Sequence, residues 1–109
     1  MTSFDDRQKG FEKKFAHDQE LQFKAQARRN KLLGQWAAEK MGLKGKDSEE
    51  YAKSVVRADF EEPGDDDVLR KIRKDLADKG VSQSDHQIRR TMDELMATAK
   101  EQIMTEVKP

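Results

Sequence analysis

Apolar residues recur at helical spacing in four windows of the chain, and glycine or proline separates these windows. The first window predicts a helix from about Asp18 to Met41, with Gly42 at the position that commonly follows a helix end. The second helix is expected to start near Asp47, whose side chain can cap it, and to end at Pro63–Gly64. No window alternates with period two, so the pattern predicts no sheet.

Two further helices are predicted in the second half of the chain. The aspartates at 65–67 open the third helix, where acids stabilise the positive end of the helix dipole, and Gly80 ends it. Ser84 begins the fourth helix, with Gln87 placed for a capping box. The apolar stripe at 88–107 is the most regular in the chain, and we expect it to form the spine of the core. Stabilising i, i+4 ion pairs are expected at Asp66–Arg70 and Asp67–Lys71.

These windows predict an all-α fold, a four-helix bundle over residues 18–109. The stripe of the first helix includes Leu21 and Ala25, but Gln22 and Arg29 interrupt it, so its strongest packing is expected in its C-terminal half. The core is predicted from the apolar positions that share a face in each window. They are Leu32, Leu33, Trp36, Val55, Phe60, Val68, Ile72, Ile88, Met92, Leu95 and Ala99.

A separate apolar face lies within residues 1–17. Phe4, Phe11 and Phe15 are spaced i, i+7, i+11 and would share one face of a helix. Gly10 costs such a helix about 1 kcal/mol relative to alanine, and isolated helices of this length are marginal in water. We therefore expect 1–17 to be a mobile N-terminal arm that becomes helical when it docks on a partner. The alternative is an N-terminal helix whose aromatic residues pack on the bundle.

Composition limits the classes of function. The 109 residues suit one domain, and with 34% hydrophobic and 40% charged residues only a modest core is expected. Acids and bases balance at 22 each, which argues against a nucleic-acid binder that works by bulk charge. The balance is uneven locally, with six bases and one acid in 21–45 and nine acids and three bases in 46–67. These two blocks either face each other or meet a charged partner.

Specific chemistry is largely absent from the sequence. The chain has no cysteine, and His17 and His86 are too far apart for a known metal motif, so no metal site and no catalytic residue are expected. Gly45–Lys46 lacks the residues that a phosphate-binding loop requires around it. No stretch is long and apolar enough to span a membrane, and no leader opens the chain, so direct membrane insertion is not expected and a cytoplasmic location is.

The order of several blocks resembles one family. The stretches FDDRQKGFEKKFAHDQE, FKAQARRNKLLGQWAAEKMGL, YAKSVVRADFEEPGDDDVLRK and ATAKEQI are similar to the zeta-subunit inhibitor of alphaproteobacterial F-type ATP synthases. The resemblance implies a four-helix bundle with a mobile inhibitory arm that enters the catalytic head of the synthase and blocks ATP hydrolysis. It implies no enzymatic activity and a peripheral position on the inner face of the membrane.

The arm supplies the predicted partner-binding residues. Its aromatic side chains would fill an apolar groove, and its charged side chains would set register and speed encounter. These residues are Phe4, Asp5, Asp6, Arg7, Phe11, Glu12, Lys13 and Phe15. Two alternatives stay open. One is a regulatory domain that binds adenine nucleotides weakly at Arg28, Arg29 and Lys31, with no other cofactor. The other is a general adaptor or nucleic-acid module that uses residues 21–45. For the free protein we favour a monomer.

Overall fold

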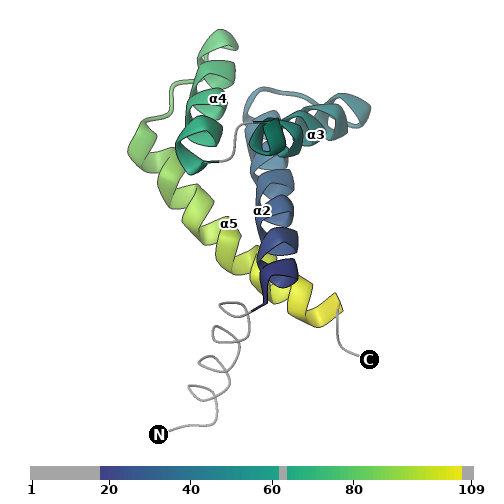
Figure 1. The fold of residues 1–109 in the computed structure, drawn as a ribbon. Helices are drawn as coiled ribbons and strands as arrows, with labels where there is room; N and C mark the ends of the chain where they lie inside the picture. The colour runs from purple at the N-terminus through teal and green to yellow at the C-terminus, as the bar shows by residue number, and fades with distance from the viewer. Residues whose placement is uncertain (1–17, 62–63, 107–109) are drawn as a thin grey trace, which may run out of the picture.

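The computed structural model describes residues 18–61 and 64–106 of the chain. They form the helices α2 (Gln19–Lys40), α3 (Lys46–Glu61), α4 (Asp65–Asp78) and α5 (Asp85–Glu106), and no strand occurs within these ranges (Figure 1). The predicted all-α, four-helix fold is confirmed. The predicted inhibitory arm, residues 1–17, lies outside the described residues, as does Val107 at the end of the predicted stripe.

Short-range signals set most of the helix ends. The carboxylate of Asp18 accepts a hydrogen bond from the backbone N–H of Leu21 at 3.1 Å and caps α2. Ser84 and Gln87 form the predicted capping box, because each accepts the other's backbone N–H, at 3.0 and 3.1 Å. Gly42 follows α2 with a φ of 79°, a left-handed conformation that a side chain would strain. Helix α3 begins at Lys46, near the predicted start, but Asp47 lies in its first turn and is not its N-cap residue.

Helix α2 is the element around which the others are arranged, since it packs against α3, α4 and α5. Figure 1 shows α3 and α4 near the C-terminal half of α2, whereas the end of α5 crosses its first turns. The contact between α2 and α3 is unusually close at Gly34. A Cβ atom at this position would lie 2.6 Å from Cα of Ala52, so the absence of a side chain sets the separation of the two helices.

The core consists of two clusters that share α2. The larger cluster joins all four helices and comprises Leu33, Ala37, Val55, Val68, Leu69, Ile72, Leu76, Ile88 and Met92. The smaller cluster joins Leu21 and Ala25 of α2 to Ile103 of α5. Burial of the predicted core residues Leu33, Val55, Val68, Ile72, Ile88, Met92 and Ala99 is confirmed. The smaller cluster shows that the first half of α2 also packs, despite its polar positions.

Four residues of the predicted core are less buried than expected. Leu32, Trp36 and Leu95 are half-buried, with Trp36 and Leu95 at the edge of the larger cluster. Phe60 was predicted wrongly, because 57% of it is exposed. Helix α3 buries Ala52 and Val55, and Phe60 lies five residues after Val55, about 140° away around the helix axis. The apolar surface of α3 is thus wider than the part that the core covers.

The two predicted ion pairs within α4, Asp66–Arg70 and Asp67–Lys71, are also wrong, because these side chains pair with other residues. Asp66 reaches Arg89 of α5 at 2.7 Å, Asp67 pairs with Arg70, and Lys71 pairs with Asp75 at 2.9 Å. For Asp66, a neighbouring helix supplies a competing cation that the i, i+4 rule does not consider, whereas Asp67 and Lys71 pair with other residues of α4 itself. Because these side chains are exposed or half-exposed, each pair contributes little to stability.

Candidate functional site

The eight predicted arm residues, Phe4 to Phe15, lie outside the described residues, so the structure describes only the point where the arm joins the body. Asp18 caps α2 through its side chain, and its carbonyl oxygen accepts the backbone N–H of Gln22 at 3.0 Å. The body therefore begins with a well-formed helix turn directly after residue 17.

The three basic residues of α2 named as a nucleotide-binding alternative point to different neighbours. The guanidinium of Arg28 donates to Gln102 at 2.8 Å and to both carboxylate oxygens of Glu106, at 2.7 and 2.9 Å, in α5. Arg29 instead turns toward α4, and Lys31 is exposed beside α3. Arg28 and Lys31 do line one surface hollow of about 500 Å³, but Arg29 does not. The structure thus brings two of the three residues together.

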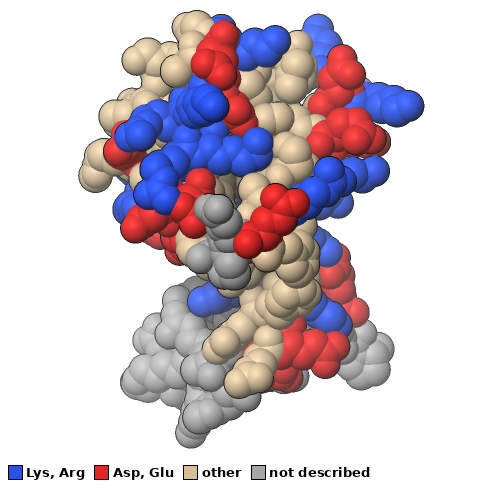
Figure 2. All heavy atoms as spheres, turned by 45° about the horizontal axis from the view of Figure 1, so that its top comes forward, with Lys and Arg blue, Asp and Glu red and all other residues tan. Residues whose placement is uncertain are grey.

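Arg29 is a structural residue in this fold. It is only 3% exposed, and its guanidinium donates to Asp65 at 2.9 Å and to the side-chain oxygen of Asn30 at 3.1 Å. Sequence reasoning took Arg29 as a weak point of the α2 stripe, whereas it joins α2 to the first turn of α4. Within the described ranges one ion pair, Arg29–Asp65, joins the basic block 21–45 to the acidic block 46–67, whereas Lys24 and Arg28 of the basic block pair with Glu20 and Glu106 outside the acidic one. Elsewhere positive and negative side chains lie next to each other over the visible surface (Figure 2).

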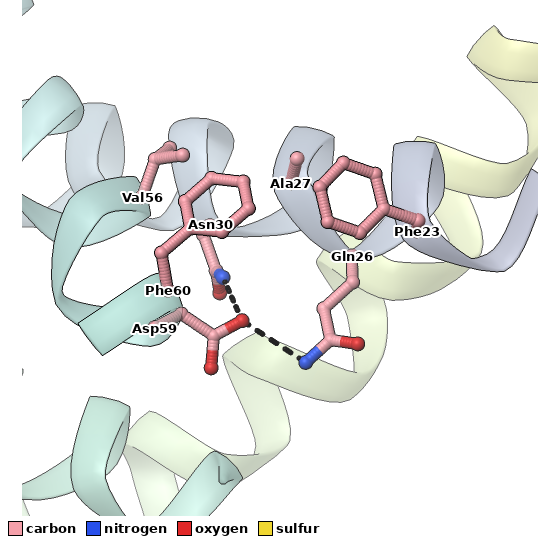
Figure 3. A pocket seen from close by; sticks show the side chains of 7 residues that line it. All are labelled: Phe23, Gln26, Ala27, Asn30, Val56, Asp59 and Phe60. Carbon is pink, nitrogen blue, oxygen red and sulfur yellow. Dashed lines mark hydrogen bonds between the residues drawn. The ribbon is translucent and has the colours of Figure 1, made fainter. Parts of the chain in front are cut away.

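A second polar contact joins α2 to α3. The side-chain amides of Gln26 and Asn30 both donate to one oxygen of the Asp59 carboxylate, at 3.0 and 2.9 Å (Figure 3). Asn30 is 1% exposed, and no buried side-chain nitrogen or oxygen in the described ranges lacks a hydrogen-bond partner. These bonds fix how α3 lies across α2, because a buried polar group that lost its partner would cost free energy.

A groove lies above these bonds, between α2 and α3. Phe23 and Phe60 form its apolar side, with ring centroids 5.2 Å apart and planes tilted by 52° (Figure 3). It comprises a pocket of about 210 Å³ beneath the two rings and a more open hollow of about 610 Å³ that shares Val56 and Phe60 with it. We call this surface the α2–α3 groove; the open hollow is lined by Lys31, Gln35, Glu49, Ala52, Lys53, Val56, Arg57 and Phe60.

Sequence analysis missed this groove because it assigned Phe60 to the core and did not single out Phe23. The available signal was the position of Phe60 relative to Val55: the two are five residues apart and therefore about 140° apart around the helix axis. An apolar residue on a second face of a helix indicates a surface that the core does not cover. The periodicity of α3 alone does not show which residues of α2 lie opposite Phe60 in the groove.

Two titratable groups of the described chain, both away from the groove, have shifted pKa values: the hydrogen bond to Asp66 raises the pKa of Arg89, and the pKa of Tyr51 is also raised. Burial, together with a 2.7 Å hydrogen bond from its hydroxyl to Asp75, raises the pKa of Tyr51 well above its ordinary value. Lys71 also contacts Asp75, and its ammonium lies 5.4 Å from the centroid of the Tyr51 ring. With the Tyr51 phenol neutral, this cluster joins α3 to α4. The contacts among its three residues account for the arrangement without a ligand.

The described residues contain no group of three or more metal-ligating side chains, and no helix among them is long and apolar enough to cross a membrane. The fold and the groove define a small all-α domain in which ion pairs join several helices, and whose α2–α3 groove is apolar with a mostly basic rim.

Comparison with known proteins places this domain in a family. The chain belongs to the family described as ATPase inhibitor subunit zeta, which matches residues 1–102. A chain whose structure was solved by solution NMR is 48% identical, with a TM-score of 0.70, and the alignment covers 80% of this chain and 99% of that one. No curated protein matches. The resemblance seen in the sequence is therefore confirmed at the level of the family, which is one of regulatory inhibitor subunits.

Proposed function

We propose that this protein inhibits ATP hydrolysis by an F-type ATP synthase by inserting residues 1–17 into the catalytic head. The observation that carries the proposal is the family match, which extends from residue 1 to residue 102 and so includes both the arm and the body. The protein would act as a peripheral subunit on the inner face of the membrane. It needs no catalytic residue of its own.

The arm has the properties that this role requires. Three of the five phenylalanines of the chain, Phe4, Phe11 and Phe15, lie at spacings that place them on one side of a helix. A catalytic interface of a rotary ATPase alternates between open and closed forms. A helix that binds only one form shifts the population toward it and stops the cycle.

The described body supports a division of labour between arm and bundle. Both core clusters are formed by side chains from α2 to α5, and the capped start of α2 gives the arm a firm point of attachment. In this arrangement the bundle holds the arm and the arm blocks the enzyme.

The decisive experiment titrates ATP hydrolysis by the purified catalytic head with full-length protein and with variants. Phe11→Glu and Phe15→Glu should each abolish inhibition, because a carboxylate buried in an apolar groove costs several kcal/mol. Deleting residues 1–17 should abolish inhibition without lowering the melting temperature of the bundle appreciably. Lys74→Glu is the control, because it introduces a glutamate at an exposed position of α4. This variant should inhibit as strongly as the wild-type protein.

The two measurements separate the proposal from its rival. A truncated protein that no longer shows a cooperative thermal transition would mean that the three phenylalanines belong to the core. A truncated protein that folds and still inhibits would move the inhibitory surface to the body.

A further inference from the structure

The α2–α3 groove exposes its aromatic side chains to an unusual degree. Phe23 is 56% exposed and Phe60 57%, and they are the exposed large hydrophobic residues of the described chain. Contiguous apolar surface with a polar rim is typical of protein-binding sites. The hydrogen bonds from Gln26 and Asn30 to Asp59 hold α2 and α3 together directly beneath the rings. The groove is therefore preformed, which lowers the entropic cost of binding a partner.

The charge of the rim selects the chemistry of the partner. Lys31, Lys53 and Arg57 line the open hollow against a single acid, Glu49. Lys31 and Arg57 have no ion-pair partner within the described ranges, whereas Arg28, Arg29, Arg73 and Arg89 all have one there. Unpaired cations around an apolar surface favour a partner whose own apolar surface is surrounded by acidic side chains.

The same charge argues against the two occupants that the chain itself could supply. The arm carries four bases and three acids in residues 1–17, so its net charge has the same sign as the rim. A second copy related by two-fold symmetry would place the basic rim against itself, which costs free energy through like-charge repulsion. The partner must therefore be a different protein.

The position of the groove relative to the arm indicates which protein that is. Phe23 follows the arm's attachment at Asp18 by five residues, a rise of about 8 Å along α2. If the arm is inserted in the catalytic head, this end of the groove cannot lie far from the surface of the head. A short connection of this kind gives the second contact a high effective concentration.

We propose that the α2–α3 groove docks the body on an acidic, partly apolar patch of the synthase head, next to the entry point of the arm. This inference rests on the proposed function, and it adds a second contact with a separate task. The arm blocks the catalytic cycle, and the groove captures the head and retains the inhibitor.

The test compares full-length variants in the same ATPase titration, with kinetics of binding to the immobilised head as a second readout. Phe60→Ser and Phe23→Ser should raise the concentration for half-maximal inhibition about tenfold, the loss expected when one aromatic contact is removed. Maximal inhibition at saturation should be unchanged because the arm is intact. Arg57→Glu should slow association and reduce its dependence on salt. Lys74→Glu, with the same charge change on α4 outside the groove, should stay within about twofold of wild type.

Several outcomes would overturn the inference. If Phe60→Ser and Arg57→Glu inhibit half-maximally at the same concentration as the wild-type protein, the groove does not contact the head. The proposed function would be unaffected by that result. Wild-type protein that neither binds nor inhibits the head would refute the proposed function and the docking together. NMR signals of Phe23 and Phe60 that shift in the free Phe11→Glu variant would identify the arm as the occupant. A change of oligomeric state in Phe60→Ser would identify a second copy.

Discussion

Gly34 gives the sharpest test of how the body is packed, because two effects of opposite sign compete there. In an isolated helix, Gly34→Ala would stabilise α2 by about 1 kcal/mol. In the fold, the new Cβ would lie 2.6 Å from Cα of Ala52, 3.1 Å from its Cβ and 3.3 Å from a methyl carbon of Val55. Carbon atoms pack at about 3.5–4.0 Å, and a backbone Cα cannot rotate away.

The helices must therefore separate by roughly 1 Å, which loosens the Val55 contacts of the larger cluster. Overpacking of this kind costs about 1–3 kcal/mol, and the rigid backbone neighbour places Gly34→Ala in the upper part of that range. After the helix-propensity gain is subtracted, the variant should be destabilised by about 1–2 kcal/mol. For a domain of this size that corresponds to a fall in melting temperature of about 4–15 °C.

Urea and thermal unfolding of Gly34→Ala, followed by helix circular dichroism, measure this change. Glu39→Ala is the matched control, because Glu39 is an exposed residue of α2 outside the α2–α3 groove and the substitution changes helix propensity without altering the α2–α3 interface. It should change stability by less than about 0.5 kcal/mol. If Gly34→Ala raises the urea midpoint, propensity outweighs packing, and the close approach of α2 and α3 does not exist as described.

Two further predictions concern the polar contacts between helices. Asp65→Ala should destabilise the fold more than Arg29→Met, because it leaves a nearly buried guanidinium without its carboxylate, whereas methionine keeps the packing of the arginine stem. Since Asp65 is half-exposed, water moderates the loss to about 1–3 kcal/mol, and equal urea midpoints for the two variants would contradict this account. Tyr51→Phe should cost about 0.5–1.5 kcal/mol near neutral pH through the lost hydrogen bond to Asp75. The pKa of Tyr51 is raised in the fold, so its neutral form stabilises the protein fully below the ordinary pKa of about 10 and less as pH rises above it. The stability gap between wild type and Tyr51→Phe should therefore narrow above that pH, and a constant gap in urea unfolding up to strongly alkaline pH would refute the assignment.

The sequence predicted the elements of this fold well because their signals are local. Gly42, Gly80 and the Ser84–Gln87 pair act over one turn of chain, and the periodic stripes identify helices wherever a single face is apolar. Asp18 was recognised as the start of α2 for the same reason. The misplaced cap at Asp47 was an error within these local rules, whereas Asp66 was assigned the wrong partner because Arg89 belongs to another helix.

The remaining features depend on how helices are placed relative to one another. Arg29 looked like a defect in an apolar stripe, yet it is buried because α4 brings Asp65 to it. Phe60 looked like a core residue, yet α3 turns that face toward Phe23 and solvent. Gly34 is a glycine within a strongly predicted helix, which indicates a close contact with another element. The sequence does not show which element makes that contact. Such features follow from crossing geometry, which periodicity does not encode.

Changes in the proposed arm and changes in the groove should affect inhibition in different ways. An inhibitor changes the maximal extent of inhibition only through contacts that distinguish the open from the closed catalytic interface. A contact made equally to both forms, such as a groove docked on the outside of the head, tightens binding without selecting a form. Changes at Phe11 should therefore lower the ceiling of inhibition, whereas changes at Phe60 should move only the concentration at which it is reached. Rim cations such as Arg57 act mainly on the rate of encounter, and that effect should fade with added salt.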